Sequence, residues 1–221
     1  MWYIKCVSTP MIQAKKILDI IRNYKRETKL QEIWYNSCFL NLIRRIINPV
    51  IVRLKYKLGI KNQTPLMLHL GCGVQYFKHY INIDSRKTQA VDLVCNISKL
   101  PYPNNSVGII ETYHAIEHLP RHDFSKALKE WHRVLIHGGQ LIIECPDFDE
   151  LVRKYLEGDE KQLDGIFALQ RFEGDYHLFG YNFKRLLRSL EECGFANIKK
   201  KDALDYHAKE WSCIIVECLK E

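Results

Sequence analysis

The sequence LMLHLGCGVQYFKHYINID, residues 66–84, decides the fold class of this chain. It begins with a short apolar run of the length of a buried strand and ends with a second short run that stops at Asp84. Between the two runs, Gly71 and Gly73 allow a tight turn whose backbone can come close to a ligand. A carboxylate at Asp84 can accept hydrogen bonds from both hydroxyls of a ribose. This order is typical of an open parallel sheet that binds an adenosine-bearing cofactor.

The spacing of this motif argues against a dinucleotide. Asp84 lies 13 residues after Gly71 (84 − 71), whereas the dinucleotide-binding motif places its acid about 20 residues further on. That motif also has a third glycine, which lets helix and strand pack closely under a pyrophosphate, and this chain lacks it. We therefore expect a cofactor without a pyrophosphate. Because a Gly-x-Gly pair is also common in plain turns, this interpretation depends on the residues that follow.

The composition indicates a globular protein of ordinary size. The chain has 221 residues, 47% of them hydrophobic, which is enough for one domain with an extension. We find no uncharged apolar run of the about 18 residues expected of a membrane span, and no signal peptide. The eight cysteines include no Cys-x-x-Cys pair and mostly lie in apolar runs. This favours a reduced, cytoplasmic protein over a disulfide framework or a zinc site.

The net charge of +7 is unevenly distributed along the chain. Residues 1–63 contain 13 Lys and Arg against 3 Asp and Glu, a balance of +10, whereas residues 64–221 contain 20 against 23, a balance of −3. Apolar residues at helical spacing, such as Phe39, Leu42 and Ile46, predict a basic amphipathic helical extension over 1–63. Such a segment can pack on the second domain or on another subunit of a homo-oligomer, contact an anionic membrane surface peripherally, or bind nucleic acid. We favour packing, then the membrane, and place nucleic acid last.

Strand and helix signals alternate from residue 66 onward. This pattern predicts an α/β fold with a doubly wound, mostly parallel seven-stranded sheet in a second domain over 64–221. The expected strands are residues 66–70, 80–84, 91–95, 108–112, 139–145, 196–200 and 211–219. The expected helices are residues 73–78, 86–89, 114–118, 122–135, 147–156 and 181–193. We expect the last strand to pair antiparallel at or near one edge, because only a short polar connection precedes it.

In order and spacing, the motifs of residues 66–219 resemble a class I S-adenosylmethionine-dependent methyltransferase. The matching segments are LHLGCG (68–73), YINIDS (80–85), CNI (95–97), GIIETYHAIEHL (108–119) and WHRVLIHGGQLIIECPD (131–147). The resemblance implies S-adenosylmethionine as cofactor, with Asp84 at its ribose. It implies these cofactor-binding residues: Leu70, Gly71, Cys72, Gly73, Asp84, Ser85, Asn96, Ile97 and His114. Asn96 stands where the family usually has an acid, and its carbonyl can still accept from the adenine amino group.

The segment HLFGYNFKRLLRSLEECGF, residues 177–195, resembles a subgroup that is similar to bacterial methyltransferases of surface-polysaccharide and other glycan pathways. His79 departs from that subgroup, whose members tend to have glycine before the second strand. From this resemblance we expect methyl transfer to a small-molecule or glycan acceptor, at oxygen.

Two histidines are the candidate catalytic residues. Transfer from a sulfonium is a direct displacement, so the protein must align the acceptor and remove the proton of a hydroxyl acceptor. Histidine, with a free pKa of about 6.5, suits that step. His114 follows the fourth strand and should face the pocket, where we favour contact with cofactor or acceptor over duty as a base. His177 lies in a loop before the last helix, where function often resides.

We expect no metal site. His114 and His118 are four residues apart and could share one ion with Glu111 or Glu117. However, Glu117 should point elsewhere on a helix, and no third ligand is marked by its spacing. We expect a structural or capping role for His118, and a solvated strand-end acid at Glu111 rather than a group that orients an acceptor.

Other classes of function stay open at this stage. Asn96 and the missing third glycine would suit a binding or scaffold protein that keeps the fold without catalysis. A nicotinamide-dependent oxidoreductase is a further alternative, against which the early acid at Asp84 speaks. No Asn-Pro-Pro-Tyr-like motif follows the fourth strand, which argues against methylation of nucleic-acid bases. Methylation of RNA is the last alternative.

Overall fold

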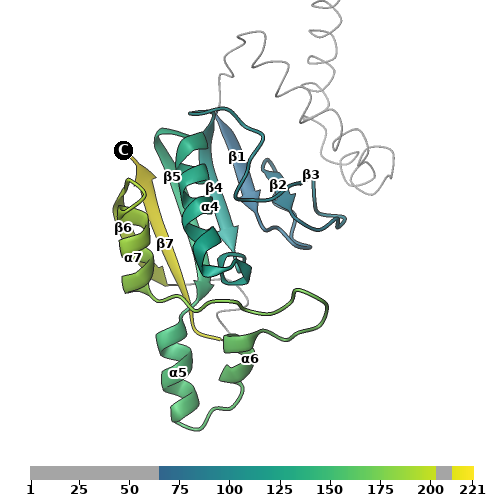
Figure 1. Cartoon of the computed structure of the whole chain (residues 1–221), viewed down its shortest axis with the longest axis vertical. Helices are drawn as coiled ribbons and strands as arrows, with labels where there is room; N and C mark the ends of the chain where they lie inside the picture. Colours follow the sequence, from purple (N-terminus) through teal and green to yellow (C-terminus); the bar gives the residue numbers. More distant parts are fainter. Residues whose placement is uncertain (1–64, 203–210) are drawn as a thin grey trace, which may run out of the picture. The chain divides into compact units, whose positions relative to one another are not determined.

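A computed structural model describes residues 65–202 and 211–221 of the chain. In this part, seven strands form one sheet in the order β3-β2-β1-β4-β5-β7-β6 (Figure 1). Their bounds are Leu66–Leu70 (β1), Ile81–Asp84 (β2), Leu93–Val94 (β3), Val107–Tyr113 (β4), Leu135–Pro146 (β5), Phe195–Asp202 (β6) and Cys213–Lys220 (β7). Strands β1 to β5 pair in parallel, whereas β7 pairs antiparallel with both β5 and β6. The predicted α/β fold and the antiparallel last strand next to the edge are confirmed.

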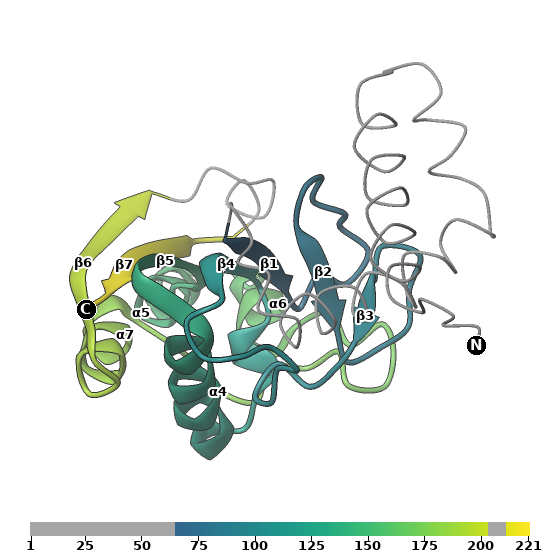
Figure 2. The same cartoon turned by 90° about the horizontal axis from the view of Figure 1, so that it is seen from above.

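Helices lie on one face of the sheet and beyond the ends of its strands. Their bounds are Ile116–His118 (η1, a 3₁₀-helix), Arg121–Val134 (α4), Phe148–Leu156 (α5), Gln162–Phe167 (α6) and Phe183–Glu191 (α7). Helices α4 and α7 lie on the same face, and α5 and α6 lie beyond the carboxyl ends of the parallel strands (Figures 1 and 2). No helix in the described ranges is long and apolar enough to cross a membrane. The predicted basic extension lies outside the described residues.

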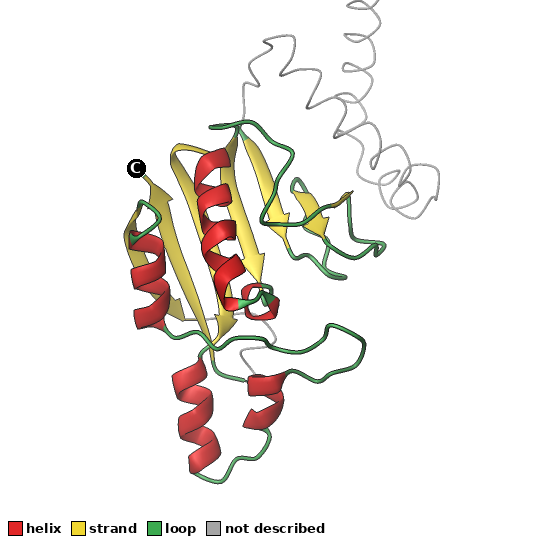
Figure 3. Ribbon diagram, viewed as in Figure 1, coloured by secondary structure: helices red, strands yellow, loops and turns green. Residues whose placement is uncertain are grey.

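Two predicted helices, at residues 73–78 and 86–89, are wrong. Both segments form turns and bends, so loops join β1 to β2 and β2 to β3 (Figure 3). The first loop is held by side chains of β2, because the amide of Phe77 donates to Asn82 Oδ1 at 2.9 Å. These side chains take up amides that a helix would otherwise use. His79, where relatives tend to have glycine, ends this loop with φ at +74°, a conformation that glycine adopts most easily.

The core lies between the sheet and helices α4 and α7. Side chains on one face of the central strands are fully buried, among them Leu68, Ile110 and Ile143. Helix α4 buries Phe124, Ala127, Leu128, Trp131 and Val134. This spacing of three and four residues gives the helix one apolar face. Each large side chain buried in this way contributes about 1.5–3 kcal/mol. The core therefore fixes the carboxyl ends of β1, β4 and β5, where the polar residues gather.

Candidate active site

The turn after β1 depends on glycine. Gly71 has φ at +70° and Gly73 has φ at +52°. The amides of Gly71 and Cys72 donate to the carbonyl of Ile83 at 2.8 and 3.1 Å, which ties the turn to β2. A Cβ on Gly71 would lie 2.3 Å from the Cβ of Ala115, so a larger residue cannot fit there. A Cβ on Gly73 would have no atom within 4 Å, so the turn borders open space at that point.

Asp84 lies directly against this turn. Its carboxylate is buried and accepts hydrogen bonds from the amides of Gly73 and Arg86, both at 2.8 Å. Two amide hydrogen bonds leave further lone pairs on the carboxylate for ribose hydroxyls. Cys72 is buried beneath the turn, and burial together with Asp84 raises the pKa of its thiol to about 12. Cys72 is therefore a packing residue and not a nucleophile.

The other predicted cofactor-binding residues lie close to the same strand ends. Leu70 is fully buried, and Ser85 is exposed immediately after β2. The amide of Cys95 donates to the carbonyl of Asp84 at 2.9 Å, which brings the segment after β3 beside β2. In that segment Ile97 is buried, whereas Asn96 is exposed and its side-chain oxygen accepts from the amide of Ser98 at 2.8 Å. The adenine contact of Asn96 stays a prediction.

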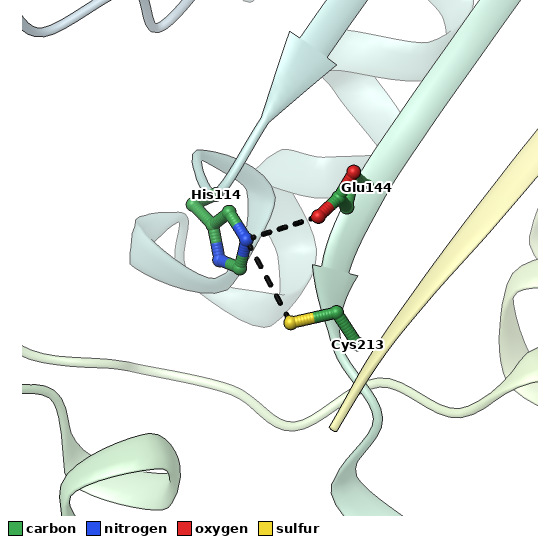
Figure 4. Close-up of side chains that lie close together, drawn as sticks. All are labelled: His114, Glu144 and Cys213. Carbon is green, nitrogen blue, oxygen red and sulfur yellow. Dashed lines mark hydrogen bonds and ion pairs between the residues drawn. The ribbon is translucent and has the colours of Figure 1, made fainter. Parts of the chain in front are cut away.

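His114 stands at the end of β4 between two buried carboxylates. Its Nδ1 lies 3.3 Å from Glu117 Oε1, and its Nε2 lies 3.4 Å from Glu144 Oε1. Nε2 also lies 3.8 Å from the sulfur of Cys213. Figure 4 shows the imidazole directed toward Glu144 on β5 and Cys213 on β7. The ends of three neighbouring strands therefore meet at this histidine.

The charges around His114 decide its protonation. Burial opposes a charged ring, but Cys213, Glu117 and Glu144 outweigh it and raise the pKa of His114 to about 12. Burial likewise opposes ionisation of Glu117, but His114 outweighs it and lowers the pKa of that carboxyl. At neutral pH, His114 is thus an imidazolium between two carboxylates. In this state its ring cannot accept a further proton.

His177 comes from the loop before α7 and reaches the same cluster. Its Nε2 lies 3.9 Å from Glu117 Oε1, while its Nδ1 bonds to the carbonyl of Gly165 at 3.1 Å. Nδ1 of His118 bonds to the carbonyl of Tyr176 at 3.0 Å, and the two imidazole rings lie with centroids 5.0 Å apart. The loop is anchored further by the amide of Leu178, which donates to the carbonyl of Glu117 at 2.8 Å. Within the described residues, one cluster therefore contains His114, Glu117, His118 and His177.

Two interpretations of acidic residues were wrong. Glu117 does not point away from the histidines, because its Oε1 lies 3.3 Å from Nδ1 of His114, a residue that precedes the 3₁₀-helix with φ at +49°. Glu111 is not a solvated acid, because it accepts hydrogen bonds from the hydroxyls of Tyr80 and Tyr113.

Sequence reasoning also missed Glu144 and Cys213. The signal for Glu144 was an acid inside the apolar run LIIECP, since a charged residue in a buried strand usually has a partner. Cys213 gave no signal beyond its position at the start of the last strand.

Comparisons with known proteins agree with this geometry. Residues 61–143 match the model of the family Methyltransf_11, which is described as a methyltransferase domain. A curated relative, an uncharacterised protein of Methanocaldococcus jannaschii, is 26% identical over 123 residues, which make up 50% of this chain and 53% of that protein. The chain thus spans about half the length of that curated relative.

Solved structures share the fold at low sequence identity. A SAM-dependent methyltransferase of Thermotoga maritima, described as a possible histamine N-methyltransferase, has a TM-score of 0.52 at 18% identity, over 81% of this chain and 98% of that one. A SAM-dependent methyltransferase of Methanosarcina mazei has a TM-score of 0.50 at 18% identity, over 74% of this chain and 96% of that one.

The sheet order and the glycine turn with Asp84 agree with the match of residues 61–143 to a methyltransferase domain, and the chain has the fold of class I methyltransferases. This match supports S-adenosylmethionine as the methyl donor that the sequence led us to expect.

Proposed function

We propose that this enzyme methylates an oxygen atom of a small hydroxylated acceptor, with a sugar of a glycan as the favoured class. One observation carries the proposal: the buried polar cluster adjoins the cofactor turn. Ala115, which follows His114, approaches the backbone of Gly71 so closely that a Cβ there would lie 2.3 Å from its own Cβ. An acceptor held by the cluster would thus lie beside the methionine part of the cofactor.

The chemistry of the cluster favours oxygen as the acceptor atom. A hydroxyl must lose its proton as it attacks, and a positioned acid–base group assists that step. Glu117 and His177 line a small pocket together with Phe148 and Gly180, and we propose that the acceptor hydroxyl approaches this pair. Burial lowers the pKa of His177, so its ring is neutral at pH 7 and can accept a proton. The proton of the hydroxyl would leave toward this pair, while the imidazolium of His114 contacts acceptor or cofactor.

The cofactor residues follow from the strand ends. Gly71 and Gly73 would hold the methionine part, Asp84 the ribose, and Asn96 with Ile97 the adenine. The resemblance of residues 177–195 to glycan-pathway enzymes supports a sugar acceptor. For the basic extension over 1–63, we propose packing on the methyltransferase domain or on a second subunit, with peripheral membrane contact as the second choice.

Calorimetry with S-adenosylmethionine tests the cofactor residues. We expect the parent to bind and Asp84→Ala to bind at least 10-fold more weakly, because two ribose hydrogen bonds to a charged group are lost. Asp123→Ala, at a more exposed acid on α4, is the matched control and should bind like the parent. A parent that does not bind, or an Asp84→Ala variant that binds equally well, would contradict the proposal.

A transfer assay tests the acceptor. Methyl-labelled donor is incubated with sugars, other hydroxylated compounds and matched amines, and the products are located by mass spectrometry and NMR. We expect label on oxygen. Label on nitrogen alone would reject the choice of acceptor atom, and tight cofactor binding without any transfer would favour a binding protein.

A further inference from the structure

We infer that Glu117, His118 and His177, with His114 beside them, form a site for one divalent cation of the zinc and first-row transition-metal type. The first three residues each offer a ligand atom, and these atoms all lie within 4.8 Å of one another. Small rotations of the side chains would bring them to metal–ligand distances of about 2.0–2.2 Å. The three residues come from η1 and from the loop before α7, two segments that hydrogen bonds hold together.

Glu117 is the buried acid of this group. Its side chain is 2% exposed, and neither carboxylate oxygen has a hydrogen-bond partner in the part of the chain that the structure describes. The nitrogen atoms that face it, His114 Nδ1 and His177 Nε2, lie 3.3 and 3.9 Å away. The imidazolium of His114 balances the charge of Glu117 without a close hydrogen bond, and a metal ion bound directly to the carboxylate would compensate the cost of its burial more fully.

His118 of η1 and His177 of the loop before α7 are oriented as metal ligands. Nδ1 of His118 faces the carbonyl of Tyr176, and Nδ1 of His177 faces the carbonyl of Gly165. A carbonyl only accepts, so each Nδ1 carries the proton and each Nε2 keeps a lone pair. Histidines that bind metals are held in this manner, with the other ring nitrogen donating to a carbonyl or a carboxylate.

His114 completes the set as the fourth ligand. With a cation bound at Glu117, its Nε2–H would donate to Glu144, 3.4 Å away, and its Nδ1 would turn a lone pair toward the ion. This is a carboxylate–histidine–metal arrangement. A second group, His114 with Glu144 and Cys213, also has the spacing of ligands. We favour the site at Glu117, because the Nδ1 atoms of its histidines His118 and His177 face backbone carbonyls, as they do in metal-binding histidines.

The ligand types indicate the kind of ion. Three imidazoles and one carboxylate suit Zn²⁺, Mn²⁺, Fe²⁺ or Co²⁺, whereas Mg²⁺ and Ca²⁺ prefer sites made of oxygen atoms. The sequence alone led us to expect no metal, because Glu117 was expected to point away from His114 on a continuous helix, and His177 lies 60 residues after Glu117 (177 − 117).

The cation would act on the acceptor, and this step rests on the proposed function. Glu117 and His177 line the pocket, so a bound ion could take an acceptor oxygen as a further ligand and lower the pKa of its hydroxyl. The hydroxyl proton would leave to solvent. The oxygen lone pair would then form the C–O bond, and the C–S bond of the sulfonium would break with its electrons remaining on sulfur. With the ion in place, His177 would serve as a ligand instead of a base.

Metal titration without cofactor or acceptor tests the site. The full chain is stripped with a chelator and titrated with Co²⁺, whose visible absorption reports coordination, and with Zn²⁺ by calorimetry. We expect one ion per chain, and at least 100-fold weaker binding by Glu117→Gln and by His177→Ala. His122→Ala is the matched control, because the side chain of His122 is 73% exposed on α4, and it should bind like the parent. Circular dichroism confirms that each variant is folded, and His118→Gln replaces any variant that is not.

Three results would overturn the inference. They are a stripped parent that binds neither ion, ligand variants that bind as tightly as the parent, and binding that depends on Glu144 and Cys213 but not on Glu117. Calorimetry of the stripped protein with S-adenosylmethionine separates this inference from the proposed function. Donor binding without metal binding would reject only the metal site, and metal binding without donor binding would reject only the cofactor site.

Discussion

Gly71 and Gly73 have similar backbone conformations but different surroundings. A side chain at Gly71 would collide with Ala115, whereas a side chain at Gly73 would enter open space beside Asp84. The first glycine therefore permits the packing of the fold, and the second leaves room that the cofactor would occupy. The two positions can be separated by mutation.

Gly73→Ala should weaken binding of S-adenosylmethionine at least 10-fold, because the methyl group would enter the space that we propose for the donor. Its cost in stability should be only about 1 kcal/mol, the usual penalty of alanine at positive φ. Gly158→Ala is the matched control, since Gly158 also has positive φ and open space around it, and it follows α5. Calorimetry and urea unfolding measure the two effects. Unchanged donor binding by Gly73→Ala would show that the cofactor does not reach this turn.

The sequence sufficed for the glycine turn and for Asp84, because both lie within one short segment whose pattern has few structural alternatives. It did not suffice for the polar cluster. His177 lies 60 residues after Glu117 (177 − 117), and only the folded loop brings the two side chains together. Glu117 was misplaced because the helix expected over 114–118 begins only at Ile116, and His114 before it has φ at +49°.

Among the secondary-structure elements, α4 is tied by Glu130 to the loop between β3 and β4. The carboxylate accepts from the guanidinium of Arg133 at 2.7 Å and from the amide of Leu100 at 2.6 Å. Burial opposes its charge, but Arg133 and the Leu100 amide outweigh burial and hold the pKa of Glu130 below its ordinary value of 4.5.

Glu130→Gln should lower the free energy of unfolding at pH 7 by about 1 kcal/mol. The folded-state pKa lies below the unfolded value, so the stabilisation is fully present above the unfolded pKa and is lost as pH falls through the folded one. The difference between variant and parent should therefore shrink below about pH 4.5. Urea unfolding at a series of pH values measures it. A difference that stays constant down to pH 3 would exclude an ionised Glu130 as its source.

Strand β7 is joined to α4 by Lys220. Its ammonium donates to the carbonyls of His132 and Leu135, at 2.7 and 2.8 Å, and to Asn105 Oδ1 at 2.8 Å. These carbonyls belong to the end of α4, where helical partners are missing.

Lys220→Met should lower the free energy of unfolding by about 1–2 kcal/mol, because it keeps the apolar stem and removes only the donor group. Lys199→Met, at an exposed position of β6, should change it little. Thermal unfolding by calorimetry compares the two. Equal effects of both substitutions would mean that the ammonium of Lys220 contributes nothing.

Elements whose apolar residues recur at regular spacing were predictable from the sequence. For α4, the predicted bounds agree with the observed ones within one residue at each end. The two helices expected after β1 and β2 were wrong. Asn82 and Asp84 accept hydrogen bonds from amides of the first loop, which ends near His79 at positive φ. Asp84 also accepts from the amide of Arg86 in the second loop. Helix α6 has only six residues and no apolar period of its own, so it was missed.

In the whole molecule, β7 holds two parts of the sheet together. It pairs with β5 on one side and with β6 on the other, and its residues Ile214, Val216 and Cys218 are buried. The parallel strands followed from the order of motifs along the sequence. The sequence did not show that β7 would lie between β5 and β6 while β6 takes the edge. The order of these two strands depends on long-range pairing.

A chain that ends at Ser212 should show no cooperative thermal transition, because β6 would lose its partner and the core would lose three buried side chains. A chain that lacks only the exposed Glu221 should melt like the parent. Circular dichroism during heating measures both. A cooperative transition close to that of the parent in the shorter chain would show that β5 and its neighbours form a stable sheet without β7.

The position of β7 also has a consequence for synthesis on the ribosome. The strand that leaves the exit tunnel last among the described elements must lie between two strands that were made before it. Until then, β5 keeps an unpaired edge and the apolar face of β7 has no place in the core, a state open to wrong pairing with other chains. The nascent protein therefore completes its sheet only after β7 has left the tunnel, and a chaperone that shields strand edges would assist it during that interval.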